Sequence, residues 1–248
     1  MSSDALVVED TASLEEVSQR LIDGDIHYLK QHFIVAKQGQ YLGLGSTRSL
    51  LQFITDQKVE SARYANPLTL LPGNVPIQKT LESCLESSLP FSLLYFDINH
   101  FKPLNDVLGY RKGDQIIMLL ADLLKSHFVG ASDFVGHIGG DDFVVITPES
   151  NPLPLAKLTQ EQFALQARRF YPEALLSAGH LHAQDRDGTQ TNFPLAALAV
   201  GIVPVSPYDQ RTASQLAESA SLAKKRAKAS SGHSYTLLMD TPKQAHGA

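Results

Sequence analysis

An eight-residue apolar and aromatic run, FSLLYFDI at residues 91–98, constrains the fold more than any other segment. Its length fits a single strand, and its lack of polar alternation indicates a strand that is covered on both faces. Residues 76–88 before it and 115–128 after it carry apolar residues at helical spacing. Helices on the faces of a central sheet indicate an α/β fold, and the hairpins expected elsewhere indicate a sheet of mixed direction.

Further elements are expected along the same half of the chain. Gly139-Gly140-Asp141 separates DFVGHI from DFVVIT, which predicts a hairpin because a tight turn with positive φ favours glycine. The polar segment 99–114 is expected to be a loop. A second hairpin around Asp187-Gly188 is expected to join GHLHAQ to one long strand, FPLAALAVGIV. The remaining expected elements are helices at 155–170 and 212–230 and a closing strand at 234–239.

The patterning changes near residue 63. Before it, Ser13 and Glu16 have the spacing of a capping box at the start of an amphipathic helix. A hairpin at 33–44 and a second helix at 47–59 are expected to follow. About 60 residues make a thin core, so this part is not expected to be self-sufficient. We expect two domains, residues 1–62 and 63–248.

Composition narrows the class of protein. The chain has 248 residues, a net charge of -5 and one cysteine, Cys84. One cysteine excludes an intramolecular disulfide framework, which fits a cytoplasmic protein. The acidic balance argues against nonspecific nucleic-acid binding, and the longest apolar stretch, 193–205, falls short of the roughly 20 residues of a membrane span. A polyanionic ligand would need metal ions or a local basic patch.

Two carboxylates indicate a metal site. Asp97 ends the apolar strand, at the edge where ligands gather in open α/β sheets, and Asp141 lies at the predicted hairpin tip. Adjacent strands would bring both within reach of one hard cation, and Mg²⁺ is commonly held by one or two carboxylates together with substrate phosphates. The alternative is a strand-end aspartate that accepts loop N–H groups and a solvated residue in a glycine turn.

Polar residues beyond the strand suit a nucleotide. Lys102 would meet a phosphate as a point charge. Asn105 and Asp114 offer groups for the edge of a base, because a carboxylate accepts from guanine N1–H and N2–H₂. For both residues, loop and helix capping is the alternative.

The ordered motifs resemble those of a GGDEF domain, the module of diguanylate cyclases. NPLTLLPGN, FDINHFKPLNDVLGYRKGD and GGDDF carry the resemblance, which covers residues 66 to about 240. It implies that two GTP molecules are joined into cyclic di-GMP in a bacterial second-messenger pathway. It also implies Mg²⁺ or Mn²⁺ as cofactor and a homodimer, because one site holds one GTP and two protomers must face each other.

The resemblance also implies roles for individual residues. The implied site consists of metal ligands Asp97, Ile98 (by its carbonyl) and Asp141; catalytic residues Asp141 and Asp142; and substrate-binding residues Lys102, Asn105, Asp114, Lys225 and Lys228. Asp142 stands where the family usually has glutamate, the residue associated with activating the attacking 3′-hydroxyl. The basic cluster that holds Lys225 and Lys228 is also interpretable as a solvated helix face.

Other positions depart from the family pattern. His233 or Ser234 stands near the place of an expected arginine that contacts the phosphates. Gly130 replaces the arginine of the family's product-inhibition motif while Asp133 remains, so feedback binding of cyclic di-GMP is not expected there.

The first 62 residues resemble a single CBS repeat. The junction ARYANPLTLLPGNVPI resembles chains in which an EAL phosphodiesterase domain precedes CBS repeats and a GGDEF domain, so upstream EAL and CBS domains are expected partners. Ser49 stands at the place of the usual ribose-binding aspartate. Two functions stay open: an active diguanylate cyclase, or a degenerate GGDEF domain that binds GTP and regulates an attached phosphodiesterase.

Overall fold

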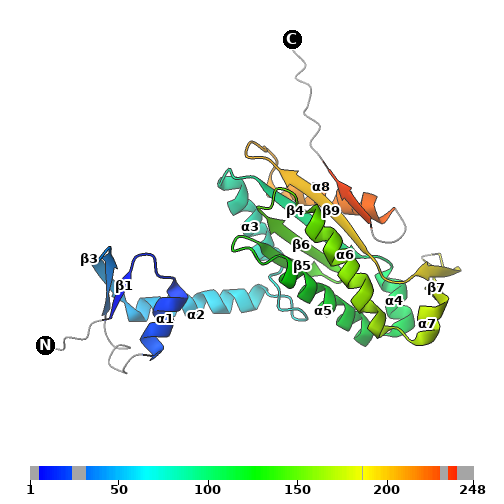
Figure 1. Cartoon of the computed structure of the whole chain (residues 1–248), viewed down its shortest axis with the longest axis horizontal. Coiled ribbons are helices and arrows are strands. Elements are labelled where there is room, and N and C mark those ends of the chain that lie inside the picture. Colours follow the sequence, from blue (N-terminus) through cyan, green and yellow to red (C-terminus); the bar gives the residue numbers. More distant parts are fainter. Residues whose placement is uncertain (1–5, 24–31, 186, 230–233, 239–248) are drawn as a thin grey trace, which may run out of the picture. The chain divides into compact units, whose positions relative to one another are not determined.

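A computed structural model describes residues 6–23, 32–185, 187–229 and 234–238 (Figure 1). Contacts within the chain divide it into two compact units, Met1–Arg63 and Tyr64–Ala248. The division falls where the patterning of the sequence changes.

The first unit combines a three-stranded sheet with two helices. Its elements are β1 (Val7–Glu9), α1 (Leu14–Asp23), β2 (His32–Lys37), β3 (Gln40–Ser46) and α2 (Thr47–Tyr64). In the sheet, β2 pairs in parallel with β1 and antiparallel with β3. Ser13 Oγ accepts a hydrogen bond from the Glu16 N–H at 3.1 Å, which confirms the predicted start of α1. The hairpin and the second helix are confirmed, and the resemblance to a CBS repeat stays a prediction.

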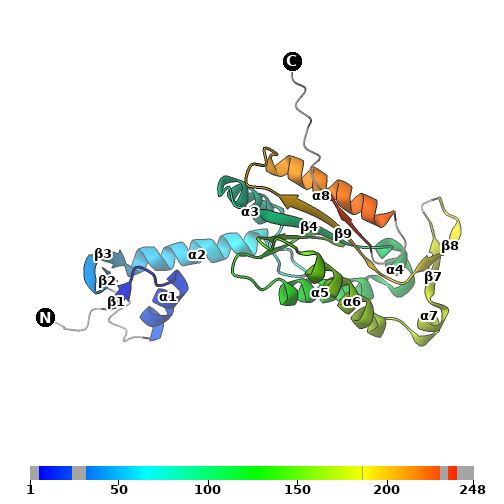
Figure 2. The same cartoon turned by 45° about the horizontal axis from the view of Figure 1, so that its top comes forward.

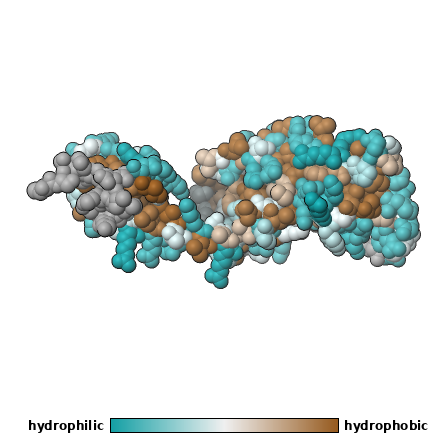
Figure 3. Space-filling view, turned by 90° about the horizontal axis from the view of Figure 1, so that it is seen from below, coloured by the Kyte–Doolittle hydropathy of each residue, from teal (hydrophilic) through white to brown (hydrophobic). Residues whose placement is uncertain are grey.

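The core of the first unit is small. Its buried cluster consists of Val8, Val17, Leu21, Phe33 and Leu50. Large apolar side chains of β3, including Tyr41 and Leu44, are more than half exposed, and hydrophobic surface is visible on this unit (Figure 3). A unit of this size buries a smaller fraction of its surface than a larger domain does, so its stability is marginal.

The second unit is built on a five-stranded sheet with the order β10-β9-β4-β6-β5. The strands are β4 (Phe91–Ile98), β5 (Phe134–Gly139), β6 (Asp142–Thr147), β9 (Leu198–Val205) and β10 (Ser234–Leu237). The central strand β4 runs antiparallel to β6 and β9, whereas β10 runs parallel to β9. The predicted sheet of mixed direction is confirmed.

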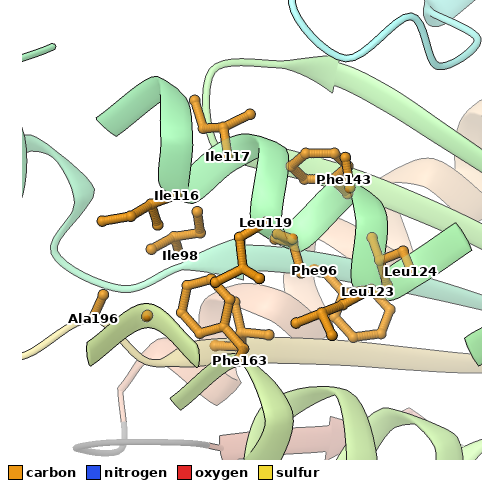
Figure 4. Close-up of a cluster of buried hydrophobic side chains, with 14 of the residues drawn as sticks. Phe96, Ile98, Ile116, Ile117, Leu119, Leu123, Leu124, Phe143, Phe163 and Ala196 are labelled. Atoms are coloured by element: carbon orange, nitrogen blue, oxygen red, sulfur yellow. The ribbon is translucent and has the colours of Figure 1, made fainter. Parts of the chain in front are cut away.

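Helices cover both faces of this sheet (Figure 2). α5 (Tyr110–His127) and α6 (Leu153–Ala167) lie on one face, and α3 (Asn74–Glu86) and α8 (Ala213–Lys228) on the other. The short helices α4 (Phe101–Leu108) and α7 (Glu173–Ala178) pack against β7. One core cluster lies between the sheet and α5 and α6, where Phe96, Phe143 and Phe163 are fully buried (Figure 4). The other lies between the sheet and α3 and α8. Side chains of β4 enter the two clusters alternately, which explains why this strand is apolar throughout.

The predicted loop at 99–114 is wrong. The segment forms α4 and the first turn of α5, and Gly109 separates the two helices at φ 80°. Pro103 lies in the first turn of α4, where the missing N–H has no helical partner to lose. Leu104 is fully buried in the core, and this tertiary packing stabilises a helix too short to be stable alone.

The predicted long strand from Phe193 is also wrong. The hairpin around Asp187-Gly188 is a separate two-stranded sheet of β7 (His180–Gln184) and β8 (Gln190–Pro194), and β9 begins only at Leu198. Ala196 lies buried between the strands, and its N–H donates to the Tyr171 hydroxyl at 3.0 Å. Because the connection is itself buried, hydrophobicity does not mark where one strand ends.

The GGDD hairpin, α6 and α8 are confirmed with small shifts of their ends. A capping box begins α8: Thr212 Oγ1 accepts from the Gln215 N–H, and Gln215 Oε1 accepts from the Thr212 N–H. Residues 230 and 239, the predicted ends of α8 and of the closing strand, lie outside the described residues. Within the described ranges, no helix is both long and apolar enough to cross a membrane.

Candidate active site

A cavity of about 800 Å³ lies beyond the carboxyl end of β4, with α4 on one side and the β7–β8 hairpin on the other. Its lining consists of Asn99, His100, Phe101, Lys102, Pro103, Asn105, Asp106, Tyr110, Asp141, Gln184, Asp185, Asp187, Phe193 and Lys228. The rings of His100 and Phe193 lie 5.2 Å apart and join the two sides. Segments far apart in the sequence therefore share one concave surface.

Strand pairing brings the acidic residues together. Asp97 lies opposite Asp142 in the β4–β6 ladder, and Asp141 immediately precedes that pair at the hairpin turn. Burial and the nearby charge of Asp141 raise the pKa of Asp97 to about 7. Burial and the charge of Asp142 raise the pKa of Asp141. Asp97, Asp141 and Asp142 thus lie close together, and the charge of one carboxylate opposes the ionisation of another.

These carboxylates fit a divalent ion. A cation between them would favour the ionised form of both carboxylates. Within the described part of the chain, no three His, Cys, Asp or Glu side chains are arranged to hold a metal ion unaided. An ion here would depend on Asp97 and Asp141, on the carbonyl at Ile98 and on phosphate oxygens of a substrate, which is the manner in which Mg²⁺ is usually bound.

The turn that presents Asp141 needs glycine and is held by a histidine. Gly140 has φ 59°, in the left-handed region. The His137 ring is 2% exposed and stacks on Phe143 with centroids 4.1 Å apart. Its Nε2 lies 3.0 Å from the Gly140 carbonyl oxygen. Because a carbonyl only accepts, Nε2 carries a proton and donates it.

The other ring nitrogen of His137 binds the loop that opens the second unit. His137 Nδ1 lies 2.9 Å from Thr69 Oγ1, and burial lowers the pKa of His137, so the ring is neutral and Nδ1 accepts from the Thr69 hydroxyl. The loop is ordered in turn by Asn66, whose Oδ1 accepts the N–H groups of Leu68 and Thr69. A continuous chain of hydrogen bonds therefore runs from this loop to the glycine turn.

Two lysines of α8 reach the acidic residues. Lys224 Nζ lies 2.8 Å from Asp142 Oδ1 and 3.3 Å from Asp97 Oδ2. Lys228 Nζ lies 2.5 Å from Asp97 Oδ1 and also lines the cavity. Burial opposes the charge of Lys224, but its hydrogen bond to Asp142 and the charge of that carboxylate outweigh burial and raise the pKa of Lys224. Lys224 is therefore a fixed positive charge at the site.

Sequence reasoning named Lys225 and Lys228 and missed Lys224. Lys225 is exposed and outside the cavity lining. The signal that would have found Lys224 is its spacing of four residues from Lys228, which puts both on one helix face. Next to that face runs the buried stripe of Ala220, Ala223 and Ala227.

The two residues expected to bind guanine, Asn105 and Asp114, differ in whether they line the cavity. Asn105 lines the cavity, and its Oδ1 is buried with no hydrogen-bond partner among the described residues. A Cβ at Gly113 would collide with this oxygen, so a side chain there would force the Asn105 amide to move. Asp114 is exposed on α5 and outside the cavity lining. Lys102 is exposed on α4 and lines the cavity, and its contact with a phosphate stays a prediction.

The departures from the family pattern fall at two further places. Asp133 Oδ2 accepts the Gly130 N–H at 2.8 Å, so this carboxylate is used within its own turn. His233 lies outside the described residues. Ser234 is buried, and its hydroxyl donates to the Ala227 carbonyl at the end of α8.

Curated relatives are similar to part of the chain. The bifunctional diguanylate cyclase/cyclic di-GMP phosphodiesterase MucR of Pseudomonas aeruginosa is 29% identical over 98 residues, which is 38% of this chain and 14% of MucR. A diguanylate cyclase of Vibrio cholerae is 33% identical over 78 residues, 30% of this chain and 24% of the relative. The matched part thus spans less than a quarter of the length of these relatives.

Solved structures share the fold. The coiled coil and GGDEF domain of DgcB from Caulobacter crescentus, in complex with c-di-GMP, is 19% identical with a TM-score of 0.54 and covers 77% of this chain and 95% of that one. The diguanylate cyclase SiaD of Pseudomonas aeruginosa, in complex with its activator SiaC, is 20% identical with a TM-score of 0.54 and covers 73% and 64%. The family "Diguanylate cyclase, GGDEF domain" matches residues 65–234. This match extends over more than half of the chain, which therefore belongs to the GGDEF family.

Proposed function

We propose that the second unit binds GTP with a divalent ion and joins two GTP molecules into cyclic di-GMP. The observation that carries the proposal is the composition of the cavity. Asp141 of the GGDD turn supplies a carboxylate, Lys102 of α4 and Lys228 of α8 supply positive charge, and Asn105 of α4 supplies an amide. Membership of the GGDEF family supports this choice of substrate and reaction.

The phosphates lie at the end of the cavity where β4 and α8 meet. Asp97 and Asp141, with the Ile98 carbonyl, would hold Mg²⁺ or Mn²⁺. A bound ion neutralises charge on the phosphate oxygens and favours attack at phosphorus. Lys228 is 39% exposed at its side chain and pairs with Asp97. It turns to the triphosphate when GTP binds, and Lys102 contacts the same phosphates from α4.

Guanine lies beside α4 and α5. The Asn105 amide binds its hydrogen-bonding edge from within the cavity. The Asp114 carboxylate, which lies outside the cavity lining, accepts from N1–H and N2–H₂ where the base extends past the cavity. The buried Asn105 Oδ1 has no hydrogen-bond partner among the described residues, and a donor that reaches it would remove the cost of that unsatisfied acceptor.

The reaction needs two protomers. The 3′-hydroxyl oxygen of one GTP forms a bond to the α-phosphorus of the other, the bond to pyrophosphate breaks, and the hydroxyl proton leaves to a base. A second transfer closes the ring. Asp142 is the carboxylate proposed to lie beside the attacking 3′-hydroxyl. Because each site holds one GTP, a homodimer that brings two cavities face to face is part of the proposal.

A second function is supported by the contacts of Asp142. Its carboxylate is one methylene shorter than the usual glutamate and is bound by the Lys224 ammonium at 2.8 Å. A carboxylate paired with a cation is a weaker base, and displacement of a catalytic group by about 1 Å can lower a rate by about 10²-fold. The unit would then bind GTP without turnover and regulate an attached EAL phosphodiesterase, with the CBS-like unit as a spacer or pairing element.

One experiment separates the two functions. The purified chain at high concentration is incubated with GTP and MgCl₂, cyclic di-GMP is measured by mass spectrometry, and GTP binding is measured by calorimetry. Cyclic di-GMP that disappears in Asp141→Asn supports the cyclase. Bound GTP without product supports the regulatory function, and absence of GTP binding contradicts both.

A further inference from the structure

Lys224 is enclosed on three sides by groups that attract a cation. Its Nζ contacts Asp142 Oδ1 at 2.8 Å and Asp97 Oδ2 at 3.3 Å. It also lies 4.2 Å from the centroid of the Tyr95 ring, a cation–π distance. An ammonium between two carboxylates on neighbouring strands occupies a position that would also suit a metal ion.

Lys224 is also held more firmly than Lys228. Its side chain is 15% exposed, compared with 39% for Lys228. The α8 backbone at Lys224 lies directly on β9, where even a Cβ at Gly201 would collide with the Lys224 amide nitrogen. Lys228 lines the cavity and can move to a ligand there, whereas Lys224 is outside the lining. The two lysines therefore do different things, although they share one helix face.

The charge balance of the site depends on Lys224. When ionised, Asp97, Asp141 and Asp142 carry three negative charges, and Lys224 supplies one positive charge among them. Lys228 also pairs with Asp97, but in the proposed function it turns to the triphosphate, so two negative charges remain and are matched by a single divalent ion. Many enzymes that transfer nucleotidyl groups use two divalent ions, which clamp the attacking and leaving oxygens. Without Lys224, the three carboxylates would have the charge to attract a second ion.

We propose that the Lys224 ammonium is a built-in cation that takes the position of a second divalent ion between Asp97 and Asp142, so that each chain binds one ion fewer than its carboxylates would otherwise hold. This inference rests on the proposed function for the location of the first ion at Asp97 and Asp141. It adds a positioning residue that the family resemblance did not indicate.

The test counts bound Mn²⁺ in the absence of turnover. The full chain is titrated with Mn²⁺, and free Mn²⁺ is measured by electron paramagnetic resonance, first alone and then with an α,β-methylene analogue of GTP. Lys224→Met is compared with Lys225→Met, which removes the same charge from the neighbouring exposed position of α8. Circular dichroism and thermal melting establish that each variant is folded, and Lys224→Gln replaces Lys224→Met if that variant is not.

We expect Lys224→Met to bind one Mn²⁺ more per chain than Lys225→Met, and Lys225→Met to bind as many as the unchanged protein. Adding Asp142→Asn to Lys224→Met should remove the extra ion. Equal Mn²⁺ counts for the Lys224 and Lys225 variants would overturn the proposal, as would an extra ion that persists without the Asp142 carboxylate. GTP binding by the unchanged protein, measured in parallel, tests the proposed function separately, because the comparison of Mn²⁺ counts requires neither turnover nor product.

Discussion

The two sides of the cavity are built differently. The inner side, formed by β4, β6 and α8, is backed by Asp97 and Lys224, which lie outside the cavity lining, are 4% and 15% exposed at their side chains, and are bound to each other. The outer side, formed by α4 and the β7–β8 hairpin, carries exposed polar residues such as Lys102 and Asp187. The inner geometry is fixed by folding, whereas the outer side can change with little effect on stability. Substitutions on the inner side should therefore affect folding and chemistry together, and those on the outer side binding alone.

The largest effect is expected on the inner side, from Asp141→Asn. The change keeps the size of the side chain but removes a charge proposed to hold the divalent ion. We expect cyclic di-GMP formation to fall by about 10²-fold or more, as for the loss of other groups that stabilise transition-state charge. Mn²⁺ binding should weaken in the same variant. Unchanged product formation would contradict the assignment of Asp141.

Gly201→Ala should come next, because it forces α8 away from β9. The added Cβ would collide with backbone atoms of Lys224 and Ala220, and overpacking of this kind costs about 1–3 kcal/mol. Gly43→Ala on β3 is the control, since its Cβ would meet nothing within 4 Å. Thermal and urea unfolding measure both, and equal stability of the two variants would show that α8 is not fixed as described.

His137→Leu tests the hydrogen bonds that hold the glycine turn. The variant leaves the Gly140 carbonyl and the Thr69 hydroxyl without their partner, at a cost of about 2 kcal/mol. Thr69→Val removes only one of the two His137 bonds, together with the long 3.4 Å contact from the Leu71 N–H, and should cost about 1 kcal/mol. We expect both variants to slow product formation with little change in GTP affinity. A loss of GTP affinity as large as the loss of rate would argue against a role limited to the turn.

On the outer side, Asn105→Ala should weaken GTP binding by about 10-fold, the value of one hydrogen bond to a polar ligand. ATP binding should change much less, because adenine lacks the guanine N1–H and N2–H₂ donors. Calorimetry with both nucleotides measures the difference, and the melting temperature should stay near that of the unchanged protein. Equal losses for GTP and ATP would refute the guanine assignment.

The smallest effect is expected for Asp187→Asn at the hairpin tip. Removing one negative charge from the lining of a cavity for a polyanion should tighten GTP binding about 2-fold at low salt, as is typical of exposed charges. Salt should abolish the gain by screening. Asp56→Asn, an exposed acid of the first unit, is the control and should leave affinity unchanged. A gain that persists at high salt would indicate that residue 187 contacts GTP directly and that the hairpin is part of the binding site.

The spacing of apolar residues and the continuous apolar runs predicted most of the fold correctly. The strand at 91–98 and the GGDD hairpin were predictable because each combines a strong hydrophobic signal with a clear stop, Asp97 or a glycine turn. The pairing of Asp97 with the GGDD carboxylates followed from the same two elements. Their local sequence and their tertiary surroundings favour the same structure.

What could not be predicted depends on contacts distant in sequence. The polar segment around Lys102 is helical because Leu104 is buried by neighbouring elements, not because its residues favour a helix. The break between β8 and β9 is hidden because Ala196 is buried within it. Lys224 was missed because a run of basic residues does not by itself show which member faces the sheet. That depends on how α8 packs against β9.

The anchoring of α8 also limits how this protein can change in length. A capping box at Thr212 fixes one end of the helix, and at the other end Ser234, the first residue of β10, binds the Ala227 carbonyl. Each residue of a helix turns the chain by about 100°. A single insertion or deletion between 213 and 224 would therefore rotate Lys224 and Lys228 away from Asp97 and Asp142. Many substitutions on the exposed face of α8 would be tolerated. Functional homologues should vary in sequence along α8 while keeping its residue count.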